Sequence, residues 1–255
     1  MNDACRAGLR ATDLRVARGG REVAAVARLS APPGRILGLM GPNGSGKSSL
    51  LRALGGLLPL SSGQVLLDGE DLLRMRPAVR AQRVACLLQR HQVAFDFTLA
   101  ELVGLGCSRP DPAAVANALR RVGLHGLGSR RWSRCSGGEQ QRAHLARALV
   151  TGARLLLLDE PDNHLDLGAR ALLSDLIRSE ADRGAVVVVA THDIDLASRC
   201  DELLLLDRGR LRHQAPPAQM LDEDCFCSTF GLSADPGLVA HHHRPPSRSP
   251  NRSTP

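Results

Sequence analysis

The sequence predicts an α/β protein in which helices cover both faces of a parallel sheet. Three observations predict it: short uninterrupted aliphatic runs, amphipathic segments that alternate with them, and a glycine-rich loop lying between one such run and one such segment. Continuous aliphatic strands are typical of sheets that are buried on both faces, and these are usually parallel. The chain of 255 residues is long enough for one sizeable core and a smaller satellite subdomain.

The first part of the chain predicts strands of two kinds. Residues 35–40 (RILGLM) form an apolar strand that runs straight into the glycine loop, and residues 48–58 have the apolar spacing of a helix. Residues 14–30 (LRVARGGREVAAVARLS) and 63–69 (GQVLLDG) carry apolar stretches beside Gly-Gly and Asp-Gly turns. We expect these last two segments to form antiparallel strands beside the main sheet.

The middle of the chain changes character. Residues 93–134 contain the helical stretches TLAELVGLG and DPAAVANALRRVGLHGL without a strand pattern, which predicts an inserted helical subdomain. Three buried strands are then predicted at 154–160, 184–193 and 201–211, together with one helix at 167–184.

Composition excludes several classes of protein. No aliphatic run approaches the roughly 20 residues that a membrane-spanning helix needs, and the N-terminus has no apolar signal core. The net charge is +7, but aromatic residues make up 2% of the chain, so base stacking is poorly supplied and no nucleic-acid partner is expected.

Seven cysteines without a C-x-x-C pair indicate free thiols in a reducing compartment. Cys225 and Cys227 have no Cys or His at finger-like spacing beside them, so we interpret them as free rather than metal-bound. The Pro-, Ser-, His- and Arg-rich residues 233–255 are expected to form a disordered basic tail.

The glycine loop matches the pattern G-x-x-x-x-G-K-[ST] between a predicted strand and a predicted helix. Its glycines allow backbone N–H groups to wrap around phosphates, Lys47 neutralises the β- and γ-phosphates, and the Ser48 hydroxyl is placed to ligate Mg²⁺. A flexible turn is the alternative, which the order of strand, loop and helix disfavours. The predicted nucleotide-binding residues of this loop are Gly41, Pro42, Asn43, Gly44, Ser45, Gly46, Lys47, Ser48 and Ser49.

Polar side chains end the other aliphatic stretches. Asp159 is placed to hold Mg²⁺ through water, and Glu160 beside it to polarise an attacking water. His192 emerges at the same edge of the sheet, where α/β proteins bind ligands, and Gln89 could reach both metal and water. Taken singly, acids at a strand end are often solvated turn residues and a lone histidine is more often structural. The predicted metal ligands are Ser48, Gln89 and Asp159.

A second segment has the chemistry of a phosphate site. Ser136, Gly137 and Gly138 lead into a helical stretch, so backbone N–H groups and the helix dipole would face an anion. One small protein with a glycine loop has no evident need for a second device of this kind.

The order of these pieces identifies a family resemblance. The glycine loop, Gln89, CSGGE, LLLLDE, NHLD and ATHD together resemble the ATP-binding cassette of ABC transporters, over nearly the whole chain up to about Leu232. The resemblance implies an ATPase domain at 1–232 with a P-loop NTPase (RecA-like) core, an N-terminal antiparallel β subdomain and the helical insert at 93–134. It implies an ATP hydrolase that uses ATP and Mg²⁺.

The resemblance also implies a head-to-tail pair of cassettes. The signature segment of one copy, here Ser136, Gly137, Gly138 and Glu139, then covers the γ-phosphate held by the glycine loop of the other copy. Asp166 would belong to the loop that crosses the interface between the copies.

Catalytic roles follow from the same resemblance. Glu160 would be the general base, and His192 would contact the γ-phosphate and steady the water. Gln89 would mark the loop that senses Mg²⁺ and touches the membrane subunit. The helical insert would dock a short coupling helix of the permease.

Several positions depart from the family pattern. Cys135 and Glu139 stand where Leu and Gln are usual. Glu occurs at the final position in relatives, so function is expected to survive, although an acid near a triphosphate would weaken the closed dimer slightly. Asp162 replaces a small hydroxyl residue. Arg18 stands where an aromatic ring normally stacks on adenine; either its guanidinium stacks there instead, or it points into water.

The segments QVAFDFTLAELVGLG, EPDNHLD and APPAQMLDEDCFCSTFGL resemble the ATPases of importers for iron–siderophore, haem and cobalamin. This implies a protein peripheral to the cytoplasmic face of the cell membrane. The implied partners are a second copy of itself, integral membrane permease subunits and, indirectly, an extracytoplasmic substrate-binding protein. The alternatives are a P-loop kinase, which has no use for CSGGE, and a soluble cassette acting in cofactor assembly or on nucleic acid.

Overall fold

The computed structural model describes residues 8–88, 95–109 and 111–221. The strands are β1 (Leu9–Arg18), β2 (Arg21–Ala31), β3 (Ile36–Met40), β4 (Ser62–Leu67), β5 (Glu70–Asp71), β6 (Val84–Leu87), β7 (Leu155–Asp159), β8 (Val186–Ala190), β9 (Glu202–Asp207) and β10 (Arg210–Ala215). The helices are α1 (Lys47–Leu54), α2 (Pro77–Arg83), α3 (Leu99–Gly104), α4 (Pro112–Arg121), α5 (Gly137–Leu149), α6 (Leu167–Asp182), α7 (Ile194–Ser198) and α8 (Pro217–Met220), with a 3-10 turn at Trp132–Arg134. The predictions for Gln89, for the Cys225–Cys227 pair and for the tail at 233–255 lie outside the described residues.

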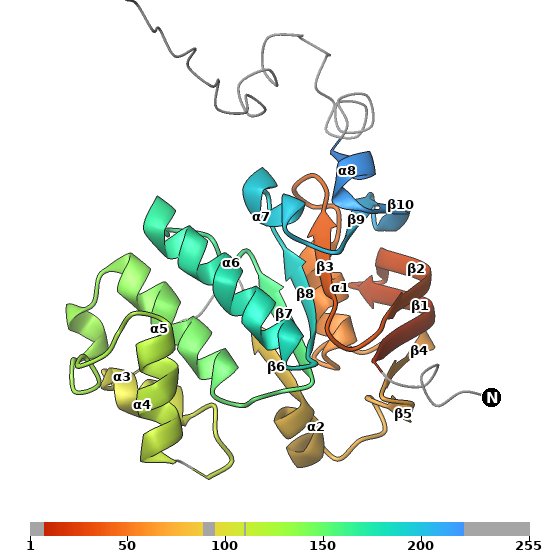
Figure 1. The fold of residues 1–255 in the computed structure, drawn as a ribbon. Helices are drawn as coiled ribbons and strands as arrows, with labels where there is room; N and C mark the ends of the chain where they lie inside the picture. The colour runs from red at the N-terminus through yellow and green to blue at the C-terminus, as the bar shows by residue number, and fades with distance from the viewer. Residues whose placement is uncertain (1–7, 89–94, 110, 222–255) are drawn as a thin grey trace, which may run out of the picture.

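One sheet runs through the molecule in the order β5-β4-β1-β2-β10-β9-β3-β8-β7-β6 (Figure 1). Within this sheet, the adjacent strands β9, β3, β8, β7 and β6 run parallel to one another. The strands β3, β7 and β8 are buried along their whole length. Alternate residues of one strand enter separate cores, so that Leu37 and Leu39 pack on the α1 side, while Ile36 and Met40 pack with α6 and the helical insert. This two-sided burial explains the uninterrupted aliphatic sequences and confirms the predicted parallel sheet.

The predicted antiparallel strands are confirmed, but they are continuous with the main sheet. β2 pairs with β1, and β1 pairs with β4, in antiparallel ladders. A single parallel pairing, Arg210 with Ala25, joins this ladder to the rest through β10. The antiparallel strands share a hydrophobic core with α1, and their packing therefore helps to position the start of that helix.

The prediction of one strand at 201–211 is wrong. The chain turns back after β9, because Arg208 and Gly209 both adopt positive φ, and it returns as the antiparallel strand β10. Left-handed residues at both central positions are what a two-residue hairpin requires. The short helix α7 between β8 and β9 was also not predicted. The predicted helix at 48–58 stops at Leu54, four residues early, where Gly55 forms its C-cap.

The helical insert is confirmed. Thr98 caps α3 in a reciprocal box with Glu101, and Asp111 caps α4. In Figure 1, α3, α4 and α5 lie together at the side of the sheet away from α1. An ion pair of 2.5 Å between Arg121 on α4 and the buried Glu180 on α6 ties the insert to the core. Among the described residues, no helix combines the length and the apolar character that a membrane span requires.

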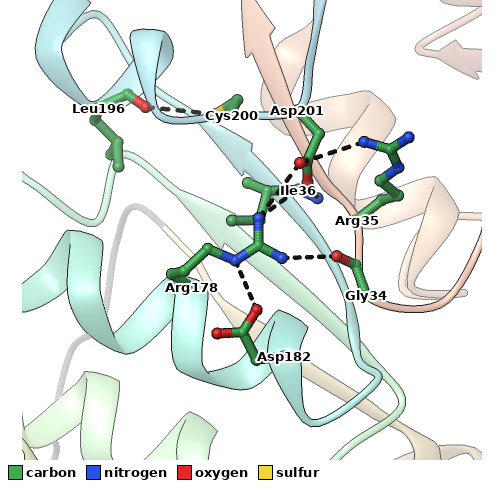
Figure 2. Close-up of polar contacts among 8 residues, drawn as sticks. All are labelled: Gly34, Arg35, Ile36, Arg178, Asp182, Leu196, Cys200 and Asp201. Atoms are coloured by element: carbon green, nitrogen blue, oxygen red, sulfur yellow. Dashed lines mark hydrogen bonds and ion pairs between the residues drawn. The ribbon is translucent and has the colours of Figure 1, made fainter.

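A polar clasp fixes the start of β3, at the end opposite the glycine loop (Figure 2). Asp201, just before β9, accepts a hydrogen bond of 2.7 Å from the Ile36 backbone N–H. Arg178 on α6 donates to Asp201 at 3.2 Å and to the Gly34 carbonyl at 2.7 Å, and Arg35 approaches Asp201 at 3.3 Å. Three segments far apart in sequence thereby set the position of β3 between β9 and β8.

We expect Asp201→Ala to destabilise the fold by about 2–3 kcal/mol, because the partly buried N–H of Ile36 loses its acceptor and Arg178 loses a carboxylate. Asp201→Asn is the matched control. It keeps an oxygen for Ile36 and loses only the charge of its partly exposed pairs with Arg35 and Arg178, so it should cost about 1 kcal/mol or less. Urea unfolding of both variants measures the difference, and equal losses would show that the charge, rather than the backbone hydrogen bond, holds the clasp.

Candidate functional site

The glycine loop after β3 is shaped by close backbone contacts. Gly41, Gly44 and Gly46 have φ values of 146°, 79° and 102°. A Cβ at Gly41 would collide with the Leu206 carbonyl, and one at Gly46 with the Val23 carbonyl, whereas a Cβ at Gly44 would meet nothing. Two of the glycines are therefore required by packing and the third by its backbone conformation. The loop ends in α1, whose N-cap is Gly46.

Lys47 is a buried cation inside this loop. Its ammonium donates hydrogen bonds to the carbonyls of Gly41, at 2.7 Å, and Pro42, at 3.1 Å. Burial lowers the pKa of Lys47, and the nearby carboxylates of Glu160 and Asp159 oppose this shift. This ammonium lies at the first turn of a helix and is hydrogen-bonded to carbonyls of the loop before it. Such a group is suited to bind phosphate oxygens.

Asp159 is a buried carboxylate whose oxygens are available to coordinate a metal ion. Its side chain ends β7, and neither oxygen has a hydrogen-bond partner of ordinary geometry among the described residues. Burial raises the pKa of Asp159, while Ser48, Arg52 and Lys47 oppose this shift. A buried carboxylate without well-aligned hydrogen bonds is costly, and with a neighbouring hydroxyl it supplies the oxygen ligands that Mg²⁺ prefers. The residues present therefore fit the predicted metal site.

Glu160 is held in an unusual backbone conformation. Its φ is 50°, and its N–H donates to the Ala190 carbonyl of β8 at 2.8 Å. The carboxylate lies 3.4 Å from Nε2 of His192 and accepts a 2.8 Å hydrogen bond from the Asn163 side chain. Positive φ at a non-glycine residue is often found where a site fixes a side chain. The structure thus brings Glu160, His192 and Lys47 to one edge of the sheet.

Asn163 was not among the sequence predictions, although it lies three residues after Glu160 in the NHLD segment. Asp162, the departure noted above, is buried and accepts a 3.1 Å hydrogen bond from the Thr191 hydroxyl. That hydroxyl in turn accepts from the N–H of Asp193, so the two residues beside His192 are fixed by Asp162. Asp166 caps α6 by accepting from Ala169.

The segment 136–139 forms the N-terminus of α5 as a capping box. The Ser136 hydroxyl accepts from the Glu139 N–H, and the Glu139 carboxylate accepts from the Ser136 N–H at 2.9 Å. The spacing S-x-x-E could have predicted this cap. Neither Gly137 nor Gly138 has positive φ, and a Cβ at Gly137 would meet nothing. Glycine at 137 is therefore not needed by the fold of one copy.

Two segments have the chemistry of a phosphate-binding site, the glycine loop and residues 136–139, and we call them the two phosphate devices. They belong to separate parts of the molecule. The helix α1 packs on β7, β8, β1 and β2, whereas α5 packs on α3, α4 and β6. Figure 1 shows α5 with the insert on the side away from α1.

Arg18 is the last residue of β1 and is exposed. Gly19 and Gly20, both at positive φ, form the turn that follows, and Arg18 pairs with Arg21 across it. The Val23 carbonyl on the returning strand touches Gly46, so the hairpin reaches the glycine loop. Within the described ranges, no hydrogen bond or ion pair engages the Arg18 guanidinium, and it is free to turn toward a bound base.

If Arg18 stacks on adenine, Arg18→Ala should weaken ATP binding about two- to thirtyfold, since cation–π contacts contribute roughly 0.5–2 kcal/mol. Binding of inorganic triphosphate should stay almost unchanged, and Arg18→Tyr should restore ATP affinity. Equilibrium binding of both ligands measures this. Equal losses for ATP and triphosphate would mean that Arg18 acts as a charge near the phosphates, and no loss for either would leave it in water.

Comparisons with known proteins point to one family. Residues 25–163 match the ABC transporter family. The hemin import ATP-binding protein HmuV of Pseudomonas fluorescens (strain Pf0-1) is 43% identical over 246 residues, covering 92% of this chain and 95% of that protein. The cobalamin import ATP-binding protein BtuD of Halobacterium salinarum (strain ATCC 29341 / DSM 671 / R1) is 37% identical over 243 residues, covering 90% of this chain and 61% of that protein.

A solved structure supports the fold. A bacterial Atm1-family ABC exporter with ATP bound superposes with a TM-score of 0.78 over 86% of this chain, at 23% identity. The chain spans 40% of the length of that exporter chain. At this level of identity the likeness concerns the fold alone, and it confirms the predicted α/β P-loop architecture.

Proposed function

This chain belongs to the ABC transporter family as an ATP-binding ATPase, and we propose that it powers the import of haem, an iron–siderophore or cobalamin through separate membrane subunits. The observation that carries the proposal is the similarity, over about nine tenths of the chain, to import ATP-binding proteins for hemin and cobalamin. A soluble cassette acting in cofactor assembly or on nucleic acid is not favoured, because these relatives are import proteins.

In the proposed hydrolysis, Glu160 orients and deprotonates the attacking water. Its carboxylate is already held by Asn163 and faces His192, so little rearrangement is needed when ATP binds. Lys47 exchanges its carbonyl partners for phosphate oxygens, and His192, whose imidazole is partly exposed, contacts the γ-phosphate. The general base is expected to contribute a factor of roughly 10²–10⁴ to the rate.

Ser48 and Asp159 would hold Mg²⁺ in this site. The support for this is the buried carboxylate of Asp159, which has no well-aligned hydrogen bond among the described residues and lies beside the Ser48 hydroxyl. When bound, the ion neutralises charge on the β- and γ-phosphate oxygens. Gln89, predicted to complete the metal ligands, lies outside the described residues.

Two copies would pair head to tail, so that Ser136 and Gly137 of one approach the γ-phosphate on Lys47 of the other. Two features support this arrangement. The two phosphate devices lie apart within one copy, and Gly137 leaves open space where the fold would accept a side chain. The second device is then useful only against another molecule's nucleotide. Asp166 would lie at the same interface.

A cleft of 360 Å³ offers a docking place for the permease. It lies between the end of α1, α2, β6, α3 and α5, and thus beside the helical insert. Leu57 and Leu105 line it and are 52% and 60% exposed. Large apolar side chains that remain exposed beside a concave surface are typical anchors for a partner helix. The position on the membrane's cytoplasmic face follows from this docking.

We expect Leu105→Asp to release the protein from membranes that contain the permease, because a carboxylate would have to be desolvated against the docked helix. Its ATP affinity should stay unchanged, since Leu105 lines the cleft, and no residue of the glycine loop is among the cleft's lining residues. Leu167→Asp is the matched control, because Leu167 is 85% exposed on α6, away from the cleft. Membrane flotation after gentle lysis gives the bound fraction, and retention of Leu105→Asp on the membrane would remove this cleft from the interface.

Growth tests the substrate class. A deletion strain that lacks redundant systems should fail to use one of three supplements, haem, iron–siderophore or cobalamin, with haem the first to test. Normal uptake of all three would overturn the substrate class and leave the ATPase assignment intact.

Affinity purification from gently solubilised membranes tests for the membrane partner. It should recover the permease together with this chain, and recovery without any membrane protein would favour the soluble alternative.

A further inference from the structure

Glu139 places a negative charge at the point where a partner's triphosphate would arrive. It stands in the signature segment of α5, where the family usually has a neutral Gln. Its carboxylate is committed to the cap of its own helix through the Ser136 N–H, so it cannot swing away without breaking that cap. The hydrogen bond from Ser136, and after it the charge of Arg130, hold the pKa of Glu139 below its usual range, so it is ionised.

Arg130 is the cation that meets this charge. Its guanidinium donates to Glu139 Oε1 at 2.8 Å, with the side chains 40% and 19% exposed. The two residues come from different elements, since Arg130 lies in the loop before the 3-10 turn and Glu139 lies on α5. Of the neighbouring arginines, Arg131 donates instead to the Asp96 carbonyl. Arg142 also lies near Glu139, but no hydrogen bond joins them in the part of the chain that is described.

The backbone of Arg130 has its own partners. Its N–H donates to Leu127 and its carbonyl accepts from Leu99, so the loop does not depend on the guanidinium for its path. What the side chain adds is the pairing with Glu139. Surface ion pairs of this exposure contribute little to folding stability. The effect of the pair is therefore expected on the binding of an anionic ligand rather than on the stability of the fold.

We propose that Arg130 is a positioning residue that neutralises Glu139 and so allows the signature segment to accept the γ-phosphate bound by a second copy. The inference rests on the head-to-tail pairing proposed above. Without Arg130, each of the two nucleotides in a closed dimer would face a carboxylate that has lost its ion-pair partner and keeps only the Ser136 N–H and the more distant charge of Arg142, and pairing would weaken at both sites. The residue acts through Glu139 and needs no contact with ATP.

The test is ATP-driven pairing of Glu160→Gln protein, measured by analytical ultracentrifugation at low salt. Adding Arg130→Ala should raise the ATP concentration for half-maximal pairing roughly three- to thirtyfold. Glu139→Gln should restore pairing in the Arg130→Ala background, because the charge that needed a counter-ion is gone. Arg130→Lys should keep most of the pairing. The defect of Arg130→Ala should shrink as salt is raised, since exposed charges are screened.

Arg120→Ala is the matched control, because Arg120 is an exposed arginine of the same insert and the one hydrogen bond of its side chain to another described residue goes to Asn117 within α4. Thermal unfolding of each variant detects any general loss of fold. If Glu160→Gln pairs with ATP and Arg130→Ala pairs equally well, the role of Arg130 is overturned while the proposed function stands. Failure of Glu139→Gln to rescue would overturn it too. If Glu160→Gln itself does not pair, the head-to-tail arrangement falls, and this inference falls with it.

Discussion

Glu160→Gln is expected to bind ATP normally, to hydrolyse it roughly 10²–10⁴-fold more slowly and to accumulate as a nucleotide-bound dimer. Glutamine retains an oxygen for the hydrogen bond from Asn163, so the left-handed turn after β7 should keep its geometry. It cannot take a proton from water. The loss therefore falls on the chemical step, and the closed state that precedes it becomes the resting state. Single-turnover ATP hydrolysis and gel filtration with ATP measure both parts.

The matched control for this variant is Glu22→Gln. It removes one carboxylate of similar size from the exposed pair with Arg15, 3.0 Å away on the antiparallel ladder. Hydrolysis and association should then match the wild type. A Glu160→Gln protein that stayed monomeric with ATP, or that turned over at the normal rate, would take the role of general base away from Glu160.

Ser136→Arg is expected to abolish ATP-driven pairing while leaving ATP affinity of the monomer within about twofold. The glycine loop of the same copy is untouched, because Ser136 begins α5, which packs on α3, α4 and β6, whereas the loop leads into α1, which packs on β7, β8, β1 and β2. A large side chain at the helix N-terminus would occupy the space that the partner's γ-phosphate needs. The variant also loses the N-cap, which costs typically about 1 kcal/mol of stability.

Two further variants show whether Ser136→Arg prevents pairing because it fills the space for the γ-phosphate or because it removes the N-cap of α5. Ser136→Ala loses the same cap without filling the space, so it should pair measurably, though more weakly than the wild type. Gly137→Val keeps the Ser136 cap, and a Cβ at this position meets nothing in one copy, so the monomer should fold while pairing fails. If Ser136→Arg lowered the ATP affinity of the monomer, the two phosphate devices would have to act on the same nucleotide, contrary to the head-to-tail arrangement.

Local sequence was sufficient for much of the fold, and it supplied the candidate site residues, whose roles stay predictions. The aliphatic strands were predicted correctly because every residue of β7 and β8 is buried. Their sequences are therefore continuously apolar, which is the pattern of a strand covered on both faces. The glycine loop lies between β3 and α1 as predicted, and Gly41 and Gly46 combine positive φ with close backbone contacts that leave no room for a side chain. That the loop binds a nucleotide stays a prediction. The break between β9 and β10 was missed, since the pair Arg208–Gly209 gives a weaker turn signal than Asn-Gly or Asp-Gly.

The sequence by itself determined which residues are candidates for the chemistry, because glycine loops and strand-end carboxylates are encoded by neighbours along the chain. Only the tertiary structure decided which of them meet. The pairing of Arg130 with Glu139, the contact of Glu160 with His192 and the clasp of Asp201 on β3 join residues from different elements. Such contacts depend on how helices and strands are oriented when they pack. That orientation is fixed by burial of both faces of the sheet together, a property of the whole chain that no single segment encodes.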